Sequence, residues 1–294
     1  MKIIKPSVEI LDQEPGLEGI YKAIEAAGRN CYQSSHLIGD GTAKPFVERM
    51  IKDGHTAMLE HGTVYLQMPL DKWMQDFRME VCPGRTHVAT LDETNSAFVT
   101  TNYRVLVEHD ALDLLEWLCE KPEPLHDRRV TARFNTQIAI SREFNRHRVD
   151  SIAEESTRYC NYSKGKYGNE ITVCVPSWLD YEEVIKADAE IAQDNKVHIN
   201  KTHHDNVIHQ WLIANYNAQN HYMRLLEMGW AAQQARTVLP LDTKTTLVHT
   251  AFVSDWQHFF DLRSRGTTGK PHPDAKILAD QLLQMFIERG YINE

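Results

Sequence analysis

The chain has 294 residues, of which 42% are hydrophobic, so it can bury a sizeable core in one large domain or two small ones. Its formal net charge of -9 argues against a general nucleic-acid or membrane-surface protein, because phosphate backbones need broad basic surfaces. No apolar run approaches the roughly 18 residues needed to cross a bilayer, and charges and prolines interrupt the N-terminal "MKIIKPSVEILDQEPG", which is therefore no signal peptide. The five cysteines form no Cys-x-x-Cys pair, which indicates reduced thiols and a cytoplasmic protein.

The first half of the chain predicts two helices and a strand. Apolar residues recur at helical spacing over 16–31, and a second helix is expected over 44–53, where Gly54 ends it. Alternating apolar residues then predict a strand over 64–68. The stretch 69–128 mixes strand-like segments with the acidic, helical "DALDLLEWLCEKPEP", and we interpret it as an insertion.

The segment "RRVTARFNTQIAISREFNRHR" begins with strand-like alternation at Val130, Ala132 and Phe134 and continues with helical spacing. This pattern places the "RHR" of 146–148 at the end of a helix. The following residues, 149–159, are expected in a loop, where several polar groups can converge on one ligand.

The rest of the chain is predicted to be largely helical. Helical patterns cover 180–236, 247–264 and 275–289, and Gly290 ends the last of them. No internal repeat, low-complexity tract or Gly/Ser linker divides the sequence. We therefore predict a single domain, 1–294, of the α+β class, with a central, mostly antiparallel sheet flanked by helices and an insertion near 69–128.

Arginine is concentrated in one short segment of this acidic chain. Arg146 and Arg148 flank His147, and Arg158 follows ten residues later. Guanidinium groups are planar and permanently charged, and they form bidentate hydrogen bonds with phosphates and carboxylates. The spacing of these arginines therefore fits a nucleotide or dinucleotide ligand. The alternative is an exposed loop whose arginines pair with Glu154 and Glu155, as surface ion pairs worth about 0 to 1 kcal/mol commonly do. The residue types alone do not decide between a nucleotide site and an exposed loop.

Other motifs are weaker. "RGTTGK" has two residues between its glycines where a phosphate loop has four, and the chain has no Gly-x-Gly-x-x-Gly. His203, His204 and His209 suggest a metal cluster, but the last two are five positions apart, so they do not share a helix face as i, i+4 ligands would. Cys160 adjoins the arginine motif, yet free cysteines are more often small buried residues than nucleophiles.

The arginine segment resembles the signature of the flavin-dependent thymidylate synthases: Arg-His-Arg, two variable residues, Ser, one variable, Asn-Glu, one variable, Ser, one variable, Arg-Tyr. The matching residues are Arg146, His147, Arg148, Ser151, Glu154, Ser156, Arg158 and Tyr159. The departure is Ala153, where Asn is usual.

Further segments resemble the same family in the same order. They are "GRNCYQSS" at 28–35, "GHTAMLEH" at 54–61, "ARTVLP" at 235–240 and "FFDLR" at 259–263. The resemblance spans most of the chain, and 69–128 is similar to an enlarged version of the family's strand connection.

The resemblance implies reductive methylation of dUMP to dTMP, with 5,10-methylenetetrahydrofolate as carbon donor and FAD reduced by NADPH. All of these ligands are anionic, which explains why an acidic protein gathers arginine locally. The family also implies a homotetramer with sites shared between subunits. Burial of the aromatic residues of "HQWLIANYN" and "DWQHFF" at subunit contacts would agree with this.

Site residues follow from the resemblance position by position. The implied FAD contacts are His55, Ala57, Arg146, His147, Arg148, Glu154 and His258. The implied dUMP contacts are Glu143, Arg146, Glu154, Glu155, Ser156, Thr157, Arg158, Arg236 and Arg263. Some positions depart from the family: Ala57 is usually a hydroxyl residue, Glu143 is Gln in many members, and Phe252 and Ser254 replace an Asn-x-Arg flavin contact.

The family is thought to methylate uracil C5 without a cysteine nucleophile, so the protein must supply positioning and charge. Arg263 is the expected catalytic residue, because a cation at the pyrimidine edge stabilises negative charge around N3 and O4. Ser156 is expected to contact the nucleotide, since no adjacent base activates its hydroxyl. Without the family pattern, Arg263 would be a helix arginine paired with Asp261 or with solvent.

Two other functions compete. A nucleotide or flavin sensor that kept the fold and lost the reaction is suggested by Ala153 and by the altered Asn-x-Arg segment. A metal-dependent hydrolase built on the histidines is the other. The enzyme is favoured over the sensor by the retained Ser156, Arg158, Arg236 and Arg263.

Overall fold

The computed structural model of the protein describes residues 1–76, 84–193 and 206–293. Its helices are α1 (Gly16–Cys31), α2 (Ala43–Lys52), α3 (Leu70–Gln75), α4 (Tyr103–Glu108), α5 (Ile138–Phe144), α6 (Tyr181–Gln193), α7 (Val207–Glu227), α8 (Ala232–Ala235), α9 (Val253–Phe260) and α10 (Pro273–Glu288). Its strands are β1 (Lys2–Ile4), β2 (Ser7–Leu11), β3 (Thr63–Pro69), β4 (His87–Leu91), β5 (Ser96–Asn102), β6 (Arg129–Gln137), β7 (Ser151–Glu154), β8 (Thr172–Cys174) and β9 (Lys244–Phe252).

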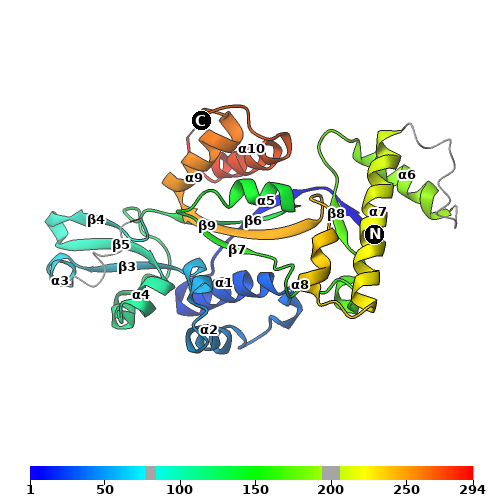
Figure 1. Ribbon diagram of the computed structural model, residues 1–294. Helices are drawn as coiled ribbons and strands as arrows, with labels where there is room; N and C mark the ends of the chain where they lie inside the picture. Colours follow the sequence, from blue (N-terminus) through cyan, green and yellow to red (C-terminus); the bar gives the residue numbers. More distant parts are fainter. Residues whose placement is uncertain (77–83, 194–205, 294) are drawn as a thin grey trace.

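The centre of the molecule is an antiparallel sheet with the strand order β2-β6-β9-β7 (Figure 1). Helices cover both of its faces, so the predicted α+β class with a mostly antiparallel central sheet is confirmed. The predicted helix over 247–264 is wrong in its first part, because β9 runs to Phe252 and α9 begins only at Val253. Nearly every residue of β9 is buried, so the strand lacks the alternation of polar and apolar residues that identifies a half-exposed strand.

Aromatic residues form the core between the central sheet and the helices α9 and α10 (Figure 1). Phe134 of β6 packs against Phe144 of α5 with ring centroids 4.9 Å apart. Trp256, Phe259 and Phe260 of α9 are fully buried in the same cluster. These side chains belong to "DWQHFF", so the expectation that this segment places its aromatic residues at subunit contacts is wrong.

On the other face of the sheet lies α1, whose predicted span of 16–31 is confirmed. Ile20 and Ile24 join a second core with α2 and β3. Ala27 packs against Ala153 of β7 and Val248 of β9. The predicted helix at 44–53 is confirmed as α2 within one residue at each end.

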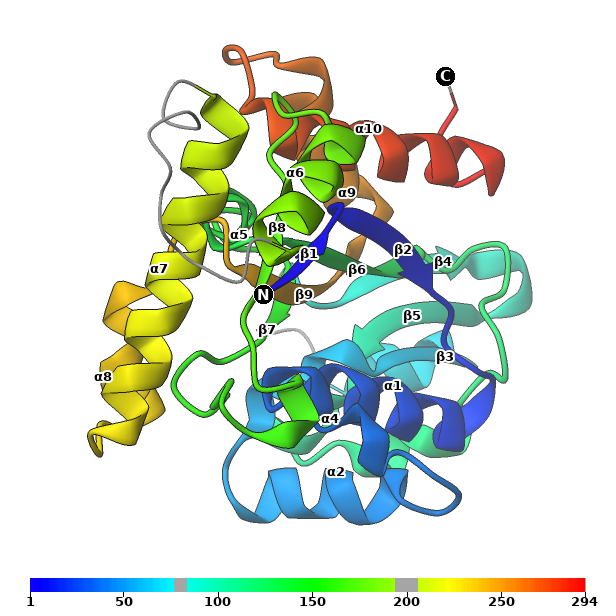
Figure 2. The same ribbon diagram turned by 90° about the vertical axis from the view of Figure 1, so that its right-hand side faces the viewer.

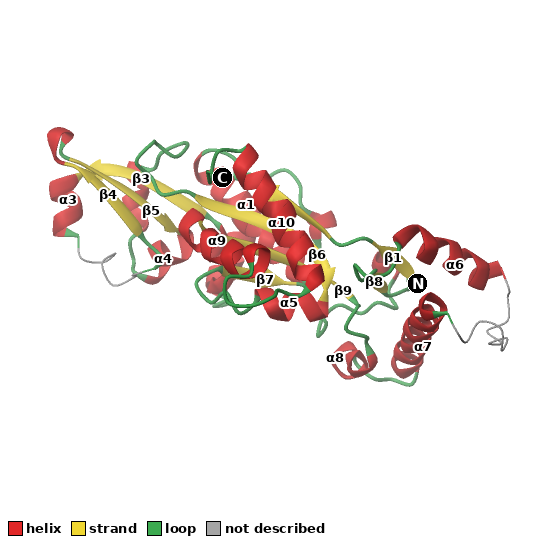
Figure 3. Ribbon diagram, turned by 90° about the horizontal axis from the view of Figure 1, so that it is seen from above, coloured by secondary structure: helices red, strands yellow, loops and turns green. Residues whose placement is uncertain are grey.

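A second antiparallel sheet, β3-β5-β4, extends from one end of the molecule (Figure 3). Two of its strands, β4 and β5, lie within the predicted insertion. The predicted acidic helix at 110–124 is wrong beyond a short 3-10 segment, Leu112–Trp117. After that segment the Cys119 backbone N–H donates to the carbonyl of Tyr65 at 2.9 Å, so the chain runs along the edge of β3 instead of coiling.

The opposite end carries α6, α7 and the short parallel pair of β1 and β8 (Figure 2). The prediction that 180–236 is largely helical is confirmed for its described residues, although 228–231 form a turn between α7 and α8. The final predicted helix is confirmed as α10, and Gly290 ends it in the left-handed conformation with φ of 67°. No helix within the described ranges is both long and apolar enough to span a membrane.

The arginine motif lies in the turn between α5 and β7. The helix ends at Phe144, before the motif begins, and the Asp150 backbone N–H donates to the His147 carbonyl at 3.2 Å. The prediction of a loop over 149–159 is wrong for Ser151–Glu154, which pairs as β7 with the edge of β9. This segment has only four residues and is polar at both ends, so its alternation of polar and apolar residues is too short to predict a strand.

Candidate active site

The predicted catalytic arginine lies where the end of α5 meets a π-helical turn, Asp261–Arg265, that follows α9. Arg263 donates from Nη1 to Glu143 Oε2 at 2.6 Å and from Nη2 to the Glu143 carbonyl at 2.7 Å. Its Nε donates to His147 Nε2 at 3.2 Å. The alternative pairing with Asp261 is wrong, because that carboxylate accepts from Arg265 at 2.7 Å. The structure therefore brings together three residues predicted from distant segments.

His147 is a buried member of this cluster. Its ring lies 4.9 Å from that of Phe259 and 6.0 Å from that of the exposed His258. Burial lowers the pKa of His147 to about 4; Asp150 opposes the shift and Arg263 adds to it. The imidazole is therefore neutral near pH 7, so its Nε2 can accept the hydrogen bond from Arg263.

Near His147 lies a buried polar pair, Asp150 and His249, that the sequence did not predict. His249 Nδ1 is 3.2 Å from Asp150 Oδ2, and both side chains are buried. Asp150 Oδ1 and His249 Nε2 are also buried and have no hydrogen-bond partner in the described part of the chain. Neither residue belongs to the family signature, and His249 falls in the strand that resembled a helix.

The loop after β7 is fixed by its two glutamates. Glu154 accepts from Asn145 Nδ2 at 2.9 Å and from Thr245 Oγ1 at 3.1 Å. Since each partner is neutral, the idea that the motif's arginines pair with Glu154 is wrong.

Glu155 is buried and its partners come from three separate segments. Lys244 Nζ donates to it at 2.8 Å, Gln33 Nε2 at 2.9 Å and the Tyr162 hydroxyl at 3.1 Å. The alternative in which Glu155 pairs with the motif's arginines is therefore also wrong. Lys244, Gln33 and Tyr162 were not predicted, because only tertiary contacts reveal them.

The remaining nucleotide-loop residues lie at the surface. Arg236 Nη1 donates to Thr157 Oγ1 at 3.0 Å, although 79 positions separate the two residues. Arg158 is exposed and lies over the ring of Tyr159, 5.3 Å from its centroid. The Ser156 backbone N–H donates to the Cys31 carbonyl at 2.9 Å. The loop thus carries Arg158 and two hydroxyl side chains, and Arg236 reaches it from a distant segment.

Neither neighbouring cysteine has the character of a nucleophile. Cys160 is fully buried, as expected, and its thiol lies 3.9 Å from the Cys31 carbonyl. Burial raises the pKa of Cys31 to about 11, so its thiol stays protonated at neutral pH.

The structure describes the histidine-rich segment only in part. His203 and His204 lie outside the described residues. Within the described part of the chain no group of three or more His, Cys, Asp and Glu side chains could hold a metal ion.

Three of the seven predicted cofactor residues line two separate cavities. The first has a volume of about 420 Å³ and is lined by His55 and Ala57, together with Arg104. The second has a volume of about 200 Å³ and is lined by Arg148 and by Glu60. Glu60 accepts from Arg104 at 2.5 Å, so this ion pair connects the walls of the two cavities.

The positions that depart from the family pattern have specific surroundings. Phe252 stacks on His87 of β4, with the ring centroids 3.6 Å apart and the planes 2° from parallel. Ala153 is buried in an apolar cluster. Nearby, the buried Asn30 of α1 donates its amide to the Thr246 carbonyl at 2.9 Å.

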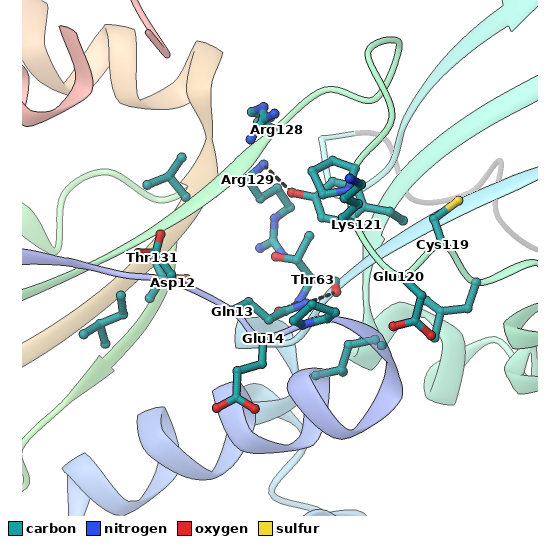
Figure 4. A pocket seen from close by; sticks show the side chains of 18 of the residues that line it. Asp12, Gln13, Glu14, Thr63, Cys119, Glu120, Lys121, Arg128, Arg129 and Thr131 are labelled. Carbon is teal, nitrogen blue, oxygen red and sulfur yellow. Dashed lines mark hydrogen bonds between the residues drawn. The ribbon is translucent and has the colours of Figure 1, made fainter. Parts of the chain in front are cut away.

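A further cavity of about 150 Å³ lies between α1, β3 and the start of β6 (Figure 4). Gln13 and Thr63 exchange two hydrogen bonds of 2.8 Å at its wall, next to Arg129. No residue that the sequence predicted for the site lines it.

Comparison with known proteins points to one family. Residues 120–289 match the sequence model of the family described as "Thymidylate synthase complementing protein". A "Probable flavin-dependent thymidylate synthase" of Paramecium bursaria Chlorella virus 1 is 37% identical over 67 residues, which is 23% of this chain and 30% of that protein. A "Flavin-dependent thymidylate synthase" of Tropheryma whipplei (strain TW08/27) is 23% identical over 172 residues, 55% of this chain and 65% of that protein. The chain thus spans less than two thirds of either relative.

Among solved structures, the fold is similar to "a UMP/dUMP methylase PolB from Streptomyces cacaoi bound with 5-Br UMP". The TM-score is 0.45 and the sequences are 16% identical, with 98% of this chain and 92% of that chain covered.

Proposed function

The chain belongs to the thymidylate synthase complementing protein family, and we propose that it converts dUMP to dTMP as a flavin-dependent thymidylate synthase. Two observations carry the proposal: Arg263 contacts Glu143 and His147, and Arg236 donates to Thr157 in the loop that also carries Arg158. In this proposal both groups belong to one site for an anionic nucleotide.

In this proposal the loop holds the phosphate of dUMP. Arg158 and Arg236 supply permanent charge, and Ser156 and Thr157 supply hydroxyl groups. Glu155 does not need to touch the nucleotide, since its contacts with Lys244 and Gln33 already fix the loop. Ser156 acts by hydrogen bonding, because none of the contacts described for it is with a general base.

Arg263 lies at the pyrimidine edge and stabilises the negative charge that builds up when C5 becomes nucleophilic. A neutral His147 and the Glu143 carbonyl orient the guanidinium. The Glu143 carboxylate also offsets its charge. The pyrimidine must therefore compete with Glu143 for one Nη group.

The residues present fit a flavin dinucleotide. The two cavities beside the Glu60–Arg104 ion pair offer apolar walls at Met50 and Met58 in one and arginines in the other. When bound, FAD would supply the hydride and one-carbon transfer chemistry. We include 5,10-methylenetetrahydrofolate as carbon donor and NADPH as reductant in the proposal, because the family implies both.

We also propose a homotetramer in the cytoplasm. His55 and Ala57 are exposed and line a different cavity from Arg148, while Arg146 and His258 are exposed beside the Arg263 cluster. A neighbouring subunit that covers these surfaces would complete the cofactor site.

Formation of dTMP tests the proposed function. The purified protein is incubated with dUMP, methylenetetrahydrofolate and NADPH, with or without FAD, and the nucleotides are separated by chromatography. We expect dTMP only when FAD is present. A protein that binds dUMP and FAD but forms no dTMP would instead be the sensor that Ala153 and Phe252 suggest.

A further inference from the structure

The buried pair of Asp150 and His249 has no role yet in the proposed reaction. The exposed fraction of the side chain is 1% for Asp150 and 0% for His249. A carboxylate can only accept, so Nδ1 of His249 carries the hydrogen of their 3.2 Å contact. Apolar residues of similar volume often stabilise a core as well as a buried pair of this kind does, so stability alone is a weak explanation for it.

His249 is held rigidly at the centre of the main sheet. It lies in β9 and pairs with Ala132 of β6 on one side and with Ile152 of β7 on the other. Its ring packs among aromatic side chains, with centroids 5.8 Å from that of Phe134 and 6.1 Å from the nearer ring system of Trp256. The position of its Nδ1 is therefore fixed by the core.

Asp150 belongs to the turn that carries the arginine motif, residues 145–150 between α5 and β7. His147 and Asp150 are the two buried residues of this turn, and the other four are exposed. The Asp150 backbone N–H donates to the His147 carbonyl at 3.2 Å, and the His147 ring in turn accepts from Arg263 at 3.2 Å. A continuous series of contacts thus runs from His249 in β9 to the guanidinium of Arg263.

We propose that Asp150 and His249 are positioning residues, which anchor the turn so that His147 holds Arg263 in the orientation that the reaction needs. Asp150 supplies both connections of the anchor, one through its carboxylate and one through its backbone. The proposal rests on the proposed function for its effect on turnover, but its effect on His147 does not depend on which reaction is catalysed.

Substitution of His249 tests the anchor. His249→Leu removes the hydrogen donor and keeps an apolar side chain among the aromatic rings, whereas His249→Asn keeps a short side-chain donor. With saturating FAD and dUMP, kcat should fall about tenfold or more in His249→Leu, because small displacements of a charge-stabilising group are costly. His249→Asn should retain most of the activity. The control Leu278→Ala, fully buried in the same core, should lower the melting temperature without this loss of kcat.

Nucleotide affinity separates the anchor from a general loss of structure. The loop after β7 is held by other contacts, since Glu155 accepts from Lys244 at 2.8 Å. The dUMP dissociation constant should therefore change less than about threefold in His249→Leu. In an Arg263→Ala background, His249→Leu should cause little further loss of kcat, because the two residues act as a unit. An unchanged kcat in His249→Leu, or losses that multiply in the double variant, would overturn the proposal.

Nuclear magnetic resonance of ¹⁵N-histidine-labelled protein gives a second readout that does not need turnover. The ring signals of His147 are identified by their absence in His147→Gln. His249→Leu should shift the Nε2 signal of His147 in the same direction as Arg263→Ala does, and Leu278→Ala should leave it in place.

The two readouts distinguish the failure of each proposal. If the unchanged protein forms no dTMP but the His147 signal responds to His249→Leu, only the proposed function fails. If dTMP forms and neither kcat nor the signal responds, only the positioning role fails. Should His249→Leu not fold, Asp150→Ala breaks the same contact from the other side, and the same results support or overturn the anchor.

Discussion

At the scale of single residues, the site depends on how Arg263 is held. Its Nε, Nη1 and Nη2 atoms all donate hydrogen bonds to Glu143 or His147, and its side chain is only 13% exposed. A pre-oriented cation of this kind requires little reorganisation when charge develops on a substrate. The family pattern predicted the arginine, and the tertiary structure identified its partners.

Arg263→Ala should reduce turnover by about 100-fold or more, the usual effect of removing a preorganised charge-stabilising donor. The FAD dissociation constant should change by less than about threefold, since Arg263 lines neither cavity that we assign to the cofactor. Steady-state kinetics and flavin fluorescence measure the two effects. Arg265→Ala, in the same helical turn but paired with Asp261, is the control. Equal losses in both quantities would contradict the role.

Glu143→Gln should strengthen dUMP binding several-fold. Glutamine keeps a hydrogen-bond acceptor for Arg263 but removes the negative charge that competes with the nucleotide for Nη1. Calorimetric titration with dUMP checks this, with Glu227→Gln on α7 as the control. Weaker binding in Glu143→Gln would mean that the carboxylate contacts the substrate directly.

The lowered pKa of His147 makes stability depend on pH. The folded pKa is about 4 and the ordinary value is 6.5, so between these values the unfolded state binds more protons and folding weakens as pH falls. The contribution of His147 should fall by about 2 kcal/mol between pH 7 and pH 5. Urea unfolding at both values measures it. His147→Gln should lose less stability than the unchanged protein over this range; an equal loss would exclude His147 as a source.

At the scale of elements, β7 and α1 show why one family position changed. Ala153 of β7 is buried and packs with Ala27 of α1 in a cluster of apolar side chains. Ala153→Asn should therefore destabilise the fold by about 1–3 kcal/mol, the cost of burying an unsatisfied polar group. Ala23→Asn, half-exposed on α1, is the control for thermal unfolding. Unchanged stability of Ala153→Asn would show that the family's residue still fits.

The sequence predicted elements well where one face is exposed. The helices α1, α2 and α10 have amphipathic patterns and clear ends, so their predicted spans were confirmed within a few residues. The strands β7 and β9 were missed, one because it is very short and the other because both of its faces are buried. The sequence likewise predicted only part of the site. The family pattern identified Arg263, whereas Asp150 and Lys244 are identified only by their tertiary contacts.

At the scale of the whole molecule, helices cover both faces of the central sheet (Figure 1), and the predicted cofactor residues His55 and Ala57 line a different cavity from Arg148. We therefore predict that light scattering gives the mass of a tetramer, about four times the 33.9 kDa of the chain. The interface must use residues other than Trp256 and Phe259, which the chain's own core buries. A monomer at micromolar concentration would count heavily against a shared site.

The central claim is that this protein methylates C5 of dUMP with a flavin. Release of tritium from 5-tritiated dUMP, with methylenetetrahydrofolate and NADPH, tests it most directly, because the label leaves only when C5 exchanges its hydrogen for the new carbon. We predict release that requires FAD and that falls about 100-fold or more in Arg263→Ala. Release without FAD, or no release from a protein that binds both dUMP and FAD, would contradict the proposed reaction.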